Sequence, residues 1–159
     1  SMKKIAIEIK WGIVFTIVAL AWIHVEKLLG WHDELIGKHP IYSMLFTLVS
    51  IVIFILALKD KKKNYFNNSI DWKQAFLSGC IVSLVITIFS PLCQYLSSEI
   101  ISPNFFQNAI NFAVENNRMS LEDATTYFNL RNYIFQSAFG GLSMGIVLSS
   151  IIAYFIKTK

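Results

Sequence analysis

Three histidines and three carboxylates that could bind a metal ion lie close together early in the chain. The set is His24, Glu26, His32, Asp33, Glu34 and His39. Imidazole nitrogens and carboxylate oxygens are ligands for zinc and related divalent ions. However, the spacing matches no recognised zinc motif, and Gly30 and Gly37 argue against one continuous helix that would carry the set. The pattern favours solvated side chains at a membrane interface, and the sequence predicts no metal site.

Other signatures of chemistry are missing from the sequence. It contains no G-x-x-x-x-G-K-[ST] phosphate loop, no G-x-G-x-x-G turn, no C-x-x-C pair and no H-E-x-x-H motif. Cys80 and Cys93 would fall on nearly opposite faces of one helix, so we expect them to be free, buried thiols. No nucleophile, base and orienting group form a recognisable set. The sequence therefore predicts a protein that is not an enzyme, with no catalytic residue and no cofactor.

The elements that must position these residues are membrane-spanning helices. Hydrophobic residues make up 55% of the chain and charged residues 15%, with a mean hydropathy of +0.53. A globular domain carries about 25% charged residues, whereas a spanning helix needs about 20 mainly apolar residues. Four segments meet this requirement: residues 11–29, 41–58, 75–96 and 133–156. We expect one all-α domain over residues 1–159 with four transmembrane helices.

The segments between these spans carry unequal positive charge, which predicts how the chain is threaded. Of the 14 lysines and arginines, ten fall on the side that holds both termini. These ten are Lys3, Lys4, Lys10, Lys59, Lys61, Lys62, Lys63, Lys73, Lys157 and Lys159. Positive residues favour the cytoplasmic side of a membrane. We therefore expect a multi-pass protein of the bacterial inner membrane with both termini in the cytoplasm.

The longest polar segment predicts a small helical cap on the opposite side of the membrane, over residues 104–132. Apolar residues between positions 105 and 114 recur on one face of a short helix. Ser120 and the acidic residues after it are typical of a helix N-terminus. No helix-breaking residue follows before the last span, so we expect one long helix over residues 121–156. Its first turns should pack against the short helix.

Small residues recur every four positions in two of the spans, and this spacing predicts close helix packing. The series are Gly79, Ser83, Thr87 and Pro91 in the third span, and Ser137, Gly141, Gly145, Ser149 and Ala153 in the last. Small side chains let the backbones of membrane helices approach closely. We expect the two stripes to face each other, with a seam between two copies or a pore lining as alternatives. Pro91 should bend its helix.

The order of loops and spans resembles a bacterial family of four-helix integral membrane proteins of unknown function. The matching stretches are "KWGI", "LKDKKK", "IDWKQAFLSG", "IISPNFF" and the glycine-rich last span that ends in lysines. The resemblance implies a small inner-membrane protein and brings no activity, cofactor or catalytic residue. The segment "HVEKLLGWHDELIGKHP" is longer and richer in histidine than the family pattern.

Charged residues are missing from the centres of the four spans, which argues against ion-coupled transport. The sequence therefore favours a non-enzymatic protein that works by packing or docking within the lipid bilayer. It would act as a homo-oligomer or as an accessory subunit of a membrane partner protein, with no nucleic-acid partner. The alternative is a passive pore or carrier for an apolar or uncharged small molecule. A continuous cavity lined by Ser83, Thr87, Gln94, Gln136 or Ser137 would favour this alternative, and a packed centre would favour docking.

Overall fold

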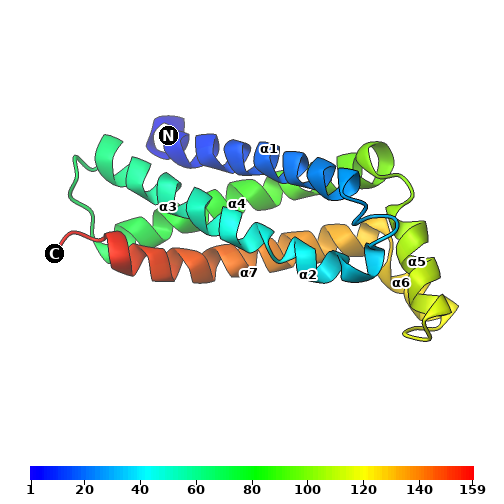
Figure 1. Ribbon diagram of the computed structural model, residues 1–159. Coiled ribbons are helices and arrows are strands. Elements are labelled where there is room, and N and C mark those ends of the chain that lie inside the picture. Colours follow the sequence, from blue (N-terminus) through cyan, green and yellow to red (C-terminus); the bar gives the residue numbers. More distant parts are fainter.

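Four long helices form the body of the protein in a computed structural model that describes residues 1–159 (Figure 1). They are α1 (Ala6–Leu28), α3 (Phe46–Asn64), α4 (Trp72–Leu96) and α7 (Leu130–Ile156). The shorter elements are the 3-10 helices η1 (Met2–Ile5) and η2 (Ile36–Lys38), the α-helices α2 (His39–Ser43), α5 (Phe105–Glu115) and α6 (Leu121–Tyr127), and the π-helix η3 (Ser97–Ile101). The expected all-α class is confirmed.

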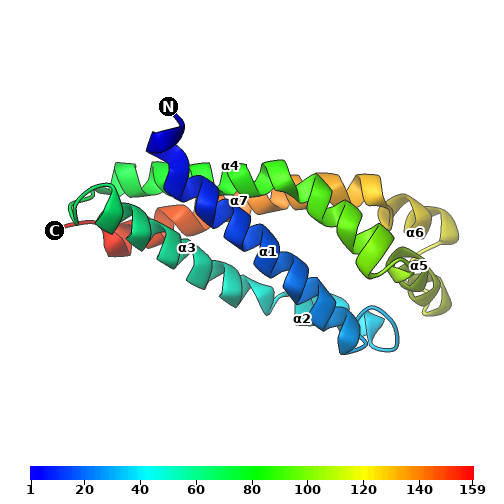
Figure 2. The ribbon, with the colours of Figure 1, turned by 90° about the horizontal axis from the view of Figure 1, so that it is seen from above.

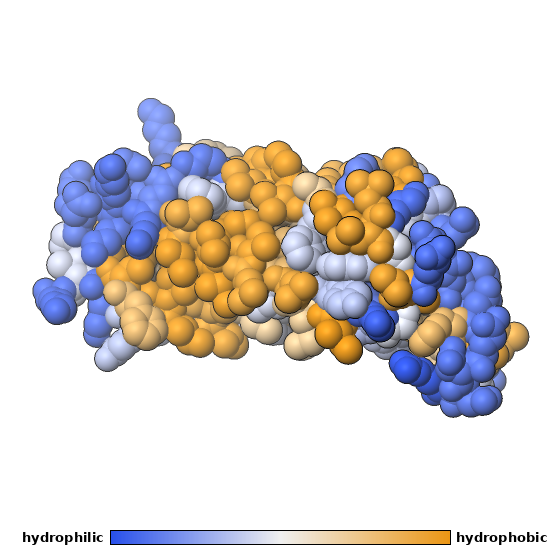
Figure 3. Space-filling view, in the orientation of Figure 1, coloured by the Kyte–Doolittle hydropathy of each residue, from blue (hydrophilic) through white to orange (hydrophobic).

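The two ends of the bundle are hydrophilic and the region between them is apolar. Both termini and the turn between α3 and α4 lie at one end, which we call the termini end (Figure 1). The helices α5 and α6 and the turn after α1 lie at the other end, which we call the cap end. On the face shown in Figure 3, a broad hydrophobic band separates the two hydrophilic ends. This is the surface pattern that a bilayer requires.

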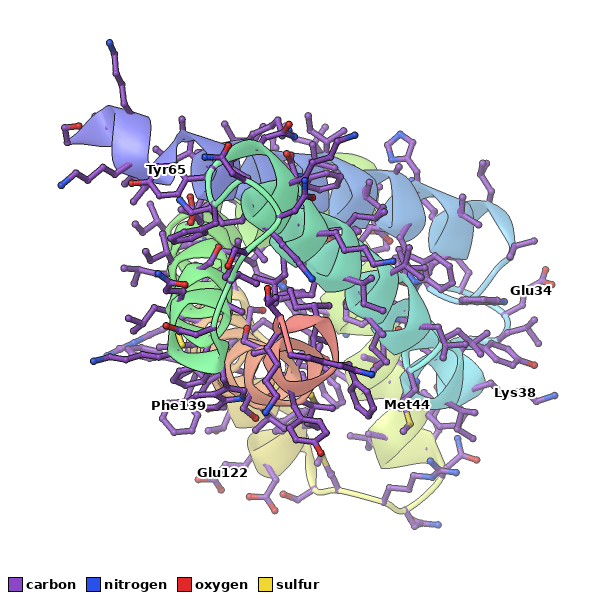
Figure 4. All side chains as sticks on the ribbon, turned by 90° about the vertical axis from the view of Figure 1, so that its left-hand side faces the viewer. Glu34, Lys38, Met44, Tyr65, Glu122 and Phe139 are labelled. Carbon is purple, nitrogen blue, oxygen red and sulfur yellow. The ribbon has the colours of Figure 1, made fainter.

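Each long helix also exposes large apolar side chains along its length. Ile17, Leu48, Ile88 and Phe139, one from each helix, are between 61% and 79% exposed. Figure 4 views the bundle from the termini end and shows Phe139 pointing away from it. Such exposure is unfavourable in water but is satisfied by lipid tails. All four helices are long and apolar enough to cross a membrane, so the protein is a multi-pass membrane protein and the four expected helices are confirmed.

Two of the helices extend beyond the expected spans at the termini end. α1 begins at Ala6 rather than at residue 11, and α3 continues to Asn64 rather than ending at residue 58. The last turn of α3 carries three lysines. Their positive charge is favourable at the C-terminal end of a helix dipole. The charged residues that follow the apolar run, and that ended the expected span, are therefore still part of the helix.

α4 and α7 form the most extensive contact between any two helices, and their small-residue stripes face each other. A Cβ atom built on Gly79 would lie 2.1 Å from Ser149 Oγ, and one built on Gly145 would lie 2.0 Å from Ser83 Oγ. Only residues without a side chain allow the backbones to approach this closely. The prediction that the two stripes pack against each other is confirmed at these positions.

Side chains fill the half of the bundle nearest the termini. Phe54, Leu58, Val82 and Ile152 come from three helices and are each at most 6% exposed. They form one continuous apolar cluster with neighbouring residues of α1 and α7. The centre of this half is therefore closed.

A buried ion pair joins three helices where this core ends. Lys61 Nζ of α3 lies 2.8 Å from Glu8 Oε1 of α1, and the Ser78 hydroxyl of α4 donates a hydrogen bond to the same oxygen at 2.9 Å. Glu8 and Lys61 are 1% and 5% exposed. Buried charges are tolerated when they are paired and hydrogen-bonded. Part of the charge at the termini end is therefore structural.

The cap consists of α5 and α6, which extend beyond the ends of the long helices (Figure 1). Ser120 accepts a hydrogen bond from the backbone N–H of Asp123 at 3.0 Å and caps α6, as expected. Ile110, Ala113 and Ala124 form a small core between the two helices. The predicted packing of these two segments is therefore confirmed.

The prediction of one long helix over residues 121–156 is wrong, because the chain breaks between α6 and α7. Phe128 and Asn129 leave the helical conformation. The Asn129 side chain then accepts a hydrogen bond from the backbone N–H of Asn132 and forms the N-cap of α7. An asparagine side chain competes with the helical backbone for hydrogen bonds and so favours such a cap. The break also allows α6 to pack on α5.

As α4 approaches the cap end, it bends away from α7 (Figure 2). Pro91 lies in this part of the helix, where its ring and its missing N–H disturb the backbone hydrogen bonds. α4 then continues into the π-helix η3. As expected from Pro91, the helix is not straight, and the two closely packed helices separate on the cap side of the small-residue contact.

Candidate functional site

A cavity of about 340 Å³ lies inside the cap-end half of the bundle, between α1, α3, α4 and α7. Phe15, Trp22, Phe46, Ile86 and Met144 form much of its apolar wall. Pockets that bind small molecules have volumes from about 300 Å³ upward. The cavity is therefore large enough to hold a small ligand.

The cavity forms because the packing of α4 on α7 loosens toward the cap. Gly145 contacts Ser83, but a Cβ atom built on Gly141, one turn away, would meet no atom within 4 Å. Gln94 Nε2 donates a hydrogen bond to Ser137 Oγ at 2.6 Å across the gap. A polar link thus replaces the small-residue contact where the helices diverge.

The cavity does not continue to the termini end. Phe54 and Leu148 line it on that side, and both belong to the packed core of the termini half. Beyond them, Leu58, Val82 and Ile152 occupy the centre of the bundle. The protein therefore contains a pocket that is closed at one end, and not a continuous channel.

The polar residues that could line a passage are only partly brought together. Gln94 and Ser137 line the cavity, as the pore or carrier alternative requires. Ser83 lies instead in the contact between α4 and α7 and is 1% exposed, and Thr87 donates a hydrogen bond to the Ser83 carbonyl. Gln136 accepts a hydrogen bond from a tyrosine of α6. Of the five residues, Ser83 thus belongs to the helix contact, Thr87 bonds to the backbone of its own helix, and Gln136 bonds to the cap.

Glu26, His32 and His39 meet at the cap-end wall of the cavity. His32 Nε2 lies 3.4 Å from Glu26 Oε1, and His39 Nε2 lies 3.7 Å from the same oxygen. One ligand atom from each residue lies within 4.8 Å of those of the other two. All three residues line the cavity. We call them the Glu26–His32–His39 cluster.

Three separate elements supply the cluster, and the turn between them brings it together. Glu26 lies in the last turn of α1, His39 begins α2, and His32 lies in the turn that connects these helices. Gly30 has a φ angle of +77°, a left-handed conformation that glycine adopts readily, and it reverses the chain after α1. Pro40 in the first turn of α2 suits a helix N-terminus.

Serine hydroxyls and an aromatic ring surround the cluster. His32 Nδ1 lies 2.9 Å from Ser102 Oγ, and the Ser43 hydroxyl donates a hydrogen bond to Glu26 Oε2 at 2.6 Å. The Phe105 ring lies 5.0 Å from the His32 ring and 4.9 Å from the His39 ring, centre to centre. Residues from α2, from the end of η3 and from α5 therefore hold the cluster in place.

The expectation of solvated side chains is wrong for these three residues. Glu26 and His32 are each 3% exposed, and the His39 side chain is 20% exposed. The physical reason is tertiary, because α5 folds over the turn after α1 and covers it with Phe105. The remaining members of the set are exposed: His24, Asp33 and Glu34. Figure 4 shows Glu34 pointing away from the bundle.

Trp22 and Cys93 also line the cavity, although nothing in the sequence predicts a site at either residue. The indole N–H of Trp22 is buried and has no hydrogen-bond partner within the protein. A buried donor without a partner is unfavourable, so a bound molecule with an acceptor would stabilise it. Cys80 and Cys93 are free, as expected, but half-buried. An indole within an apolar span carries no sequence signal that distinguishes a cavity wall from a lipid-facing surface.

Comparison with curated proteins and with solved structures found no match to this chain. A family profile, by contrast, matches residues 10–158, which include the cavity, the Glu26–His32–His39 cluster and nearly all of the four spans. The profile describes proteins of unknown function, and four apolar helices agree with the resemblance seen in the loops and spans. The chain belongs to DUF4199, a family of proteins of unknown function.

Proposed function

We propose that this protein is a non-enzymatic membrane protein that binds one small, mainly apolar molecule inside the cap-end half of its bundle. The observation that carries the proposal is a cavity of about 340 Å³ that ends against a packed core. This function is closest to the carrier alternative from the sequence. A role in packing or docking alone requires no internal space, because a bundle of this size can be filled with side chains.

The lining of the cavity supports a ligand with an apolar body and a small polar head. Aromatic and aliphatic residues such as Phe15, Phe46 and Ile86 would surround the body. Polar groups gather at the cap-end wall, where the Glu26–His32–His39 cluster and the Ser43 hydroxyl lie. Binding pockets of this kind use a few polar groups to orient a mostly apolar ligand. The head should therefore face the cap.

The same arrangement favours binding over free passage. A pore requires a continuous path, whereas Leu58, Val82 and Ile152 fill the termini half. A molecule that enters from the cap side or from the surrounding lipid would leave by the same route. A second copy or a partner protein is not required to complete the cavity, so the lipid bilayer is its only necessary partner in this proposal.

We propose that the termini end faces the cytoplasm of a bacterial inner membrane. The support is the excess of lysine at that end, which includes the basic last turn of α3. The cavity would then open toward the extracytoplasmic half of the bilayer. The exposed polar side chains of the cap end, such as Lys38 of η2 and Glu122 of α6 in Figure 4, would face that side.

Two neighbouring glycines of α7 offer a matched test of the cavity. A Cβ atom on Gly140 or on Gly141 would meet no atom within 4 Å, but only Gly141 lines the cavity. Native mass spectrometry of protein extracted in a mild detergent should show the wild type with a co-purified molecule. Gly141→Leu should lose that molecule, because the new side chain occupies the cavity.

Gly140→Leu is the control, because it adds the same side chain on the same helix outside the cavity. It should retain the co-purified molecule at the wild-type level. A wild-type protein that carries no molecule from membranes of its native host, or equal occupancy in all three proteins, would overturn the proposal. If both variants lost the co-purified molecule, the effect would come from a change in α7 and not from filling the cavity. This result would also overturn the proposal.

A further inference from the structure

We infer that the Glu26–His32–His39 cluster is a binding site for a divalent transition-metal ion of the zinc class. This inference goes beyond the binding of an organic molecule and does not depend on it. It departs from the sequence expectation of no metal site, because folding creates a proximity that the spacing does not reveal.

The donor atoms of the cluster already lie almost at coordination distances. Bonds of about 2.0–2.1 Å to a tetrahedral zinc ion place neighbouring ligand atoms about 3.3–3.5 Å apart. Glu26 Oε1 lies 3.4 Å from His32 Nε2 and 3.7 Å from His39 Nε2. One ligand atom from each of the three residues lies within 4.8 Å of those of the other two. Side-chain rotations that move atoms by about 1 Å would complete the site.

The hydrogen bonds around the cluster leave one nitrogen of His32 and one oxygen of Glu26 facing its centre. His39 Nε2 lies 3.0 Å from Ser43 Oγ and would exchange this contact for the metal. When His32 Nδ1–H donates to Ser102 Oγ, 2.9 Å away, the lone pair of Nε2 points toward Glu26. The Ser43 hydroxyl occupies Glu26 Oε2 and leaves Oε1, the atom that faces both imidazoles. Histidine ligands characteristically donate their second N–H to such an outer partner, which fixes the tautomer and the ring orientation.

Burial makes a cation at this position favourable. The Glu26 carboxylate is 3% exposed and makes no ion pair with lysine or arginine. A buried carboxylate is unfavourable without a positive partner. A divalent ion bound to two neutral imidazoles would supply that charge. A protonated histidine could supply it instead, and the experiment below separates the two states.

The ligand types select the class of ion. Two imidazoles and one carboxylate suit zinc, cobalt and related ions, whereas calcium and magnesium take oxygen ligands. Three protein ligands leave a fourth position, and all three line the cavity. The open position would therefore face the interior of the cavity, where it could hold water or the polar head of a bound molecule.

The test is a calorimetric titration in which Zn²⁺ is added to tag-free protein in detergent. The wild type should bind one zinc ion per chain. His39→Gln and Glu26→Gln should each weaken the affinity by about tenfold or more, and His24→Gln should not change it. His24 is the matched control, because it is an exposed histidine on the same helix as Glu26 and lies outside the cluster.

Co²⁺ provides a second readout that reports the ligands themselves. Its visible absorption should show a four- or five-coordinate site in the wild type and in His24→Gln, and this signal should be lost in His39→Gln. Zinc should also raise the melting temperature of the wild type and not that of His39→Gln. A variant is folded if, in the absence of zinc, it has the same melting temperature as the wild type. Its loss of zinc binding can then be assigned to the site.

Three outcomes would overturn the inference. The first is no zinc binding by the folded wild type, which would assign the cluster to a protonated histidine paired with Glu26. The second is an equal zinc affinity in the wild type and in His39→Gln. The third is a loss of zinc affinity in His24→Gln. Either of these two results would indicate adventitious binding at the surface. Gly141→Leu separates this inference from the proposed function, because it should lose the apolar molecule and still bind zinc.

Discussion

Two buried carboxylates, Glu8 and Glu26, lie near opposite ends of the bundle, and their partners differ. Glu8 pairs with Lys61 and accepts a hydrogen bond from Ser78, and none of these residues lines the cavity. Glu26 has two imidazoles as partners and lies in the cavity wall. A lysine forms a permanent ion pair, whereas imidazoles can bind a metal. The Glu8 pair is therefore assigned to stability and the Glu26 cluster to binding.

At the residue scale, Lys61→Met should destabilise the protein strongly. The change leaves Glu8 buried without its cation, and breaking such a pair costs about 3–5 kcal/mol. The free energy of unfolding should fall by this amount in a denaturant titration of the purified protein, monitored by circular dichroism.

The controls use the neighbouring lysine and the partner residue. Lys63→Met alters an exposed lysine of the same turn and should change the free energy of unfolding by less than about 1 kcal/mol. The double change Glu8→Met with Lys61→Met should recover most of the loss, because no charge remains buried. Equal destabilisation by Lys61→Met and Lys63→Met would contradict a structural role for the pair.

Among the helices, α4 and α7 form the most closely packed pair, and the small-residue contact sets where that close packing ends. The backbones meet at Gly79 and Gly145, and they separate on the cap side of Ser83. Pro91 and the π-helix η3 continue that separation. The cavity therefore begins where the contact between the two stripes stops.

Gly145→Leu should disrupt this contact. A Cβ atom there would lie 2.0 Å from Ser83 Oγ, so the helices must move apart. Overpacking of this kind costs about 1–3 kcal/mol, and the melting temperature should fall. Thermal unfolding measured by circular dichroism would show the change.

Gly140→Leu, which meets no neighbouring atom, should melt within error of the wild type. A Gly145→Leu protein that keeps the wild-type melting temperature but changes from oligomer to monomer would give the stripe a different role. In that case the stripe would face a second copy and not α4.

At the scale of the whole molecule, the difference between the two ends predicts orientation. Lysines gather at the termini end, and the cap carries a mixture of acidic and basic side chains. A fluorescent protein that matures only in the cytoplasm, fused after Lys159, should be fluorescent. The same reporter inserted after Asn117, in the turn between α5 and α6, should be dark.

Alkaline phosphatase, which is active only outside the cytoplasm, provides the reverse reading at the same two positions. It should be active after Asn117 and inactive after Lys159. The opposite pattern for both reporters would place the cap in the cytoplasm. The cavity would then open toward the cytoplasmic half of the bilayer.

Local patterns in the sequence were enough to predict the class of the protein and its four helices, and they favoured the pairing of the small-residue stripes over a seam between copies or a pore lining. These features depend on local runs and periods: about 20 apolar residues for a span, and a four-residue repeat for a helix face. The same local signals failed at Asn129. There the capping tendency of one side chain, together with burial of α6 on α5, ended a helix that the hydrophobic pattern would have continued.

The position of the candidate site, by contrast, follows from tertiary contacts and has no local signal in the sequence. The cavity exists because α4 bends away from α7, and its closed end depends on side chains from three helices. Glu26, His32 and His39 look like scattered loop residues in the sequence. The left-handed turn at Gly30 and the covering ring of Phe105 convert them into one buried cluster. Proximity and burial are properties of the folded chain, so spacing alone could not reveal them.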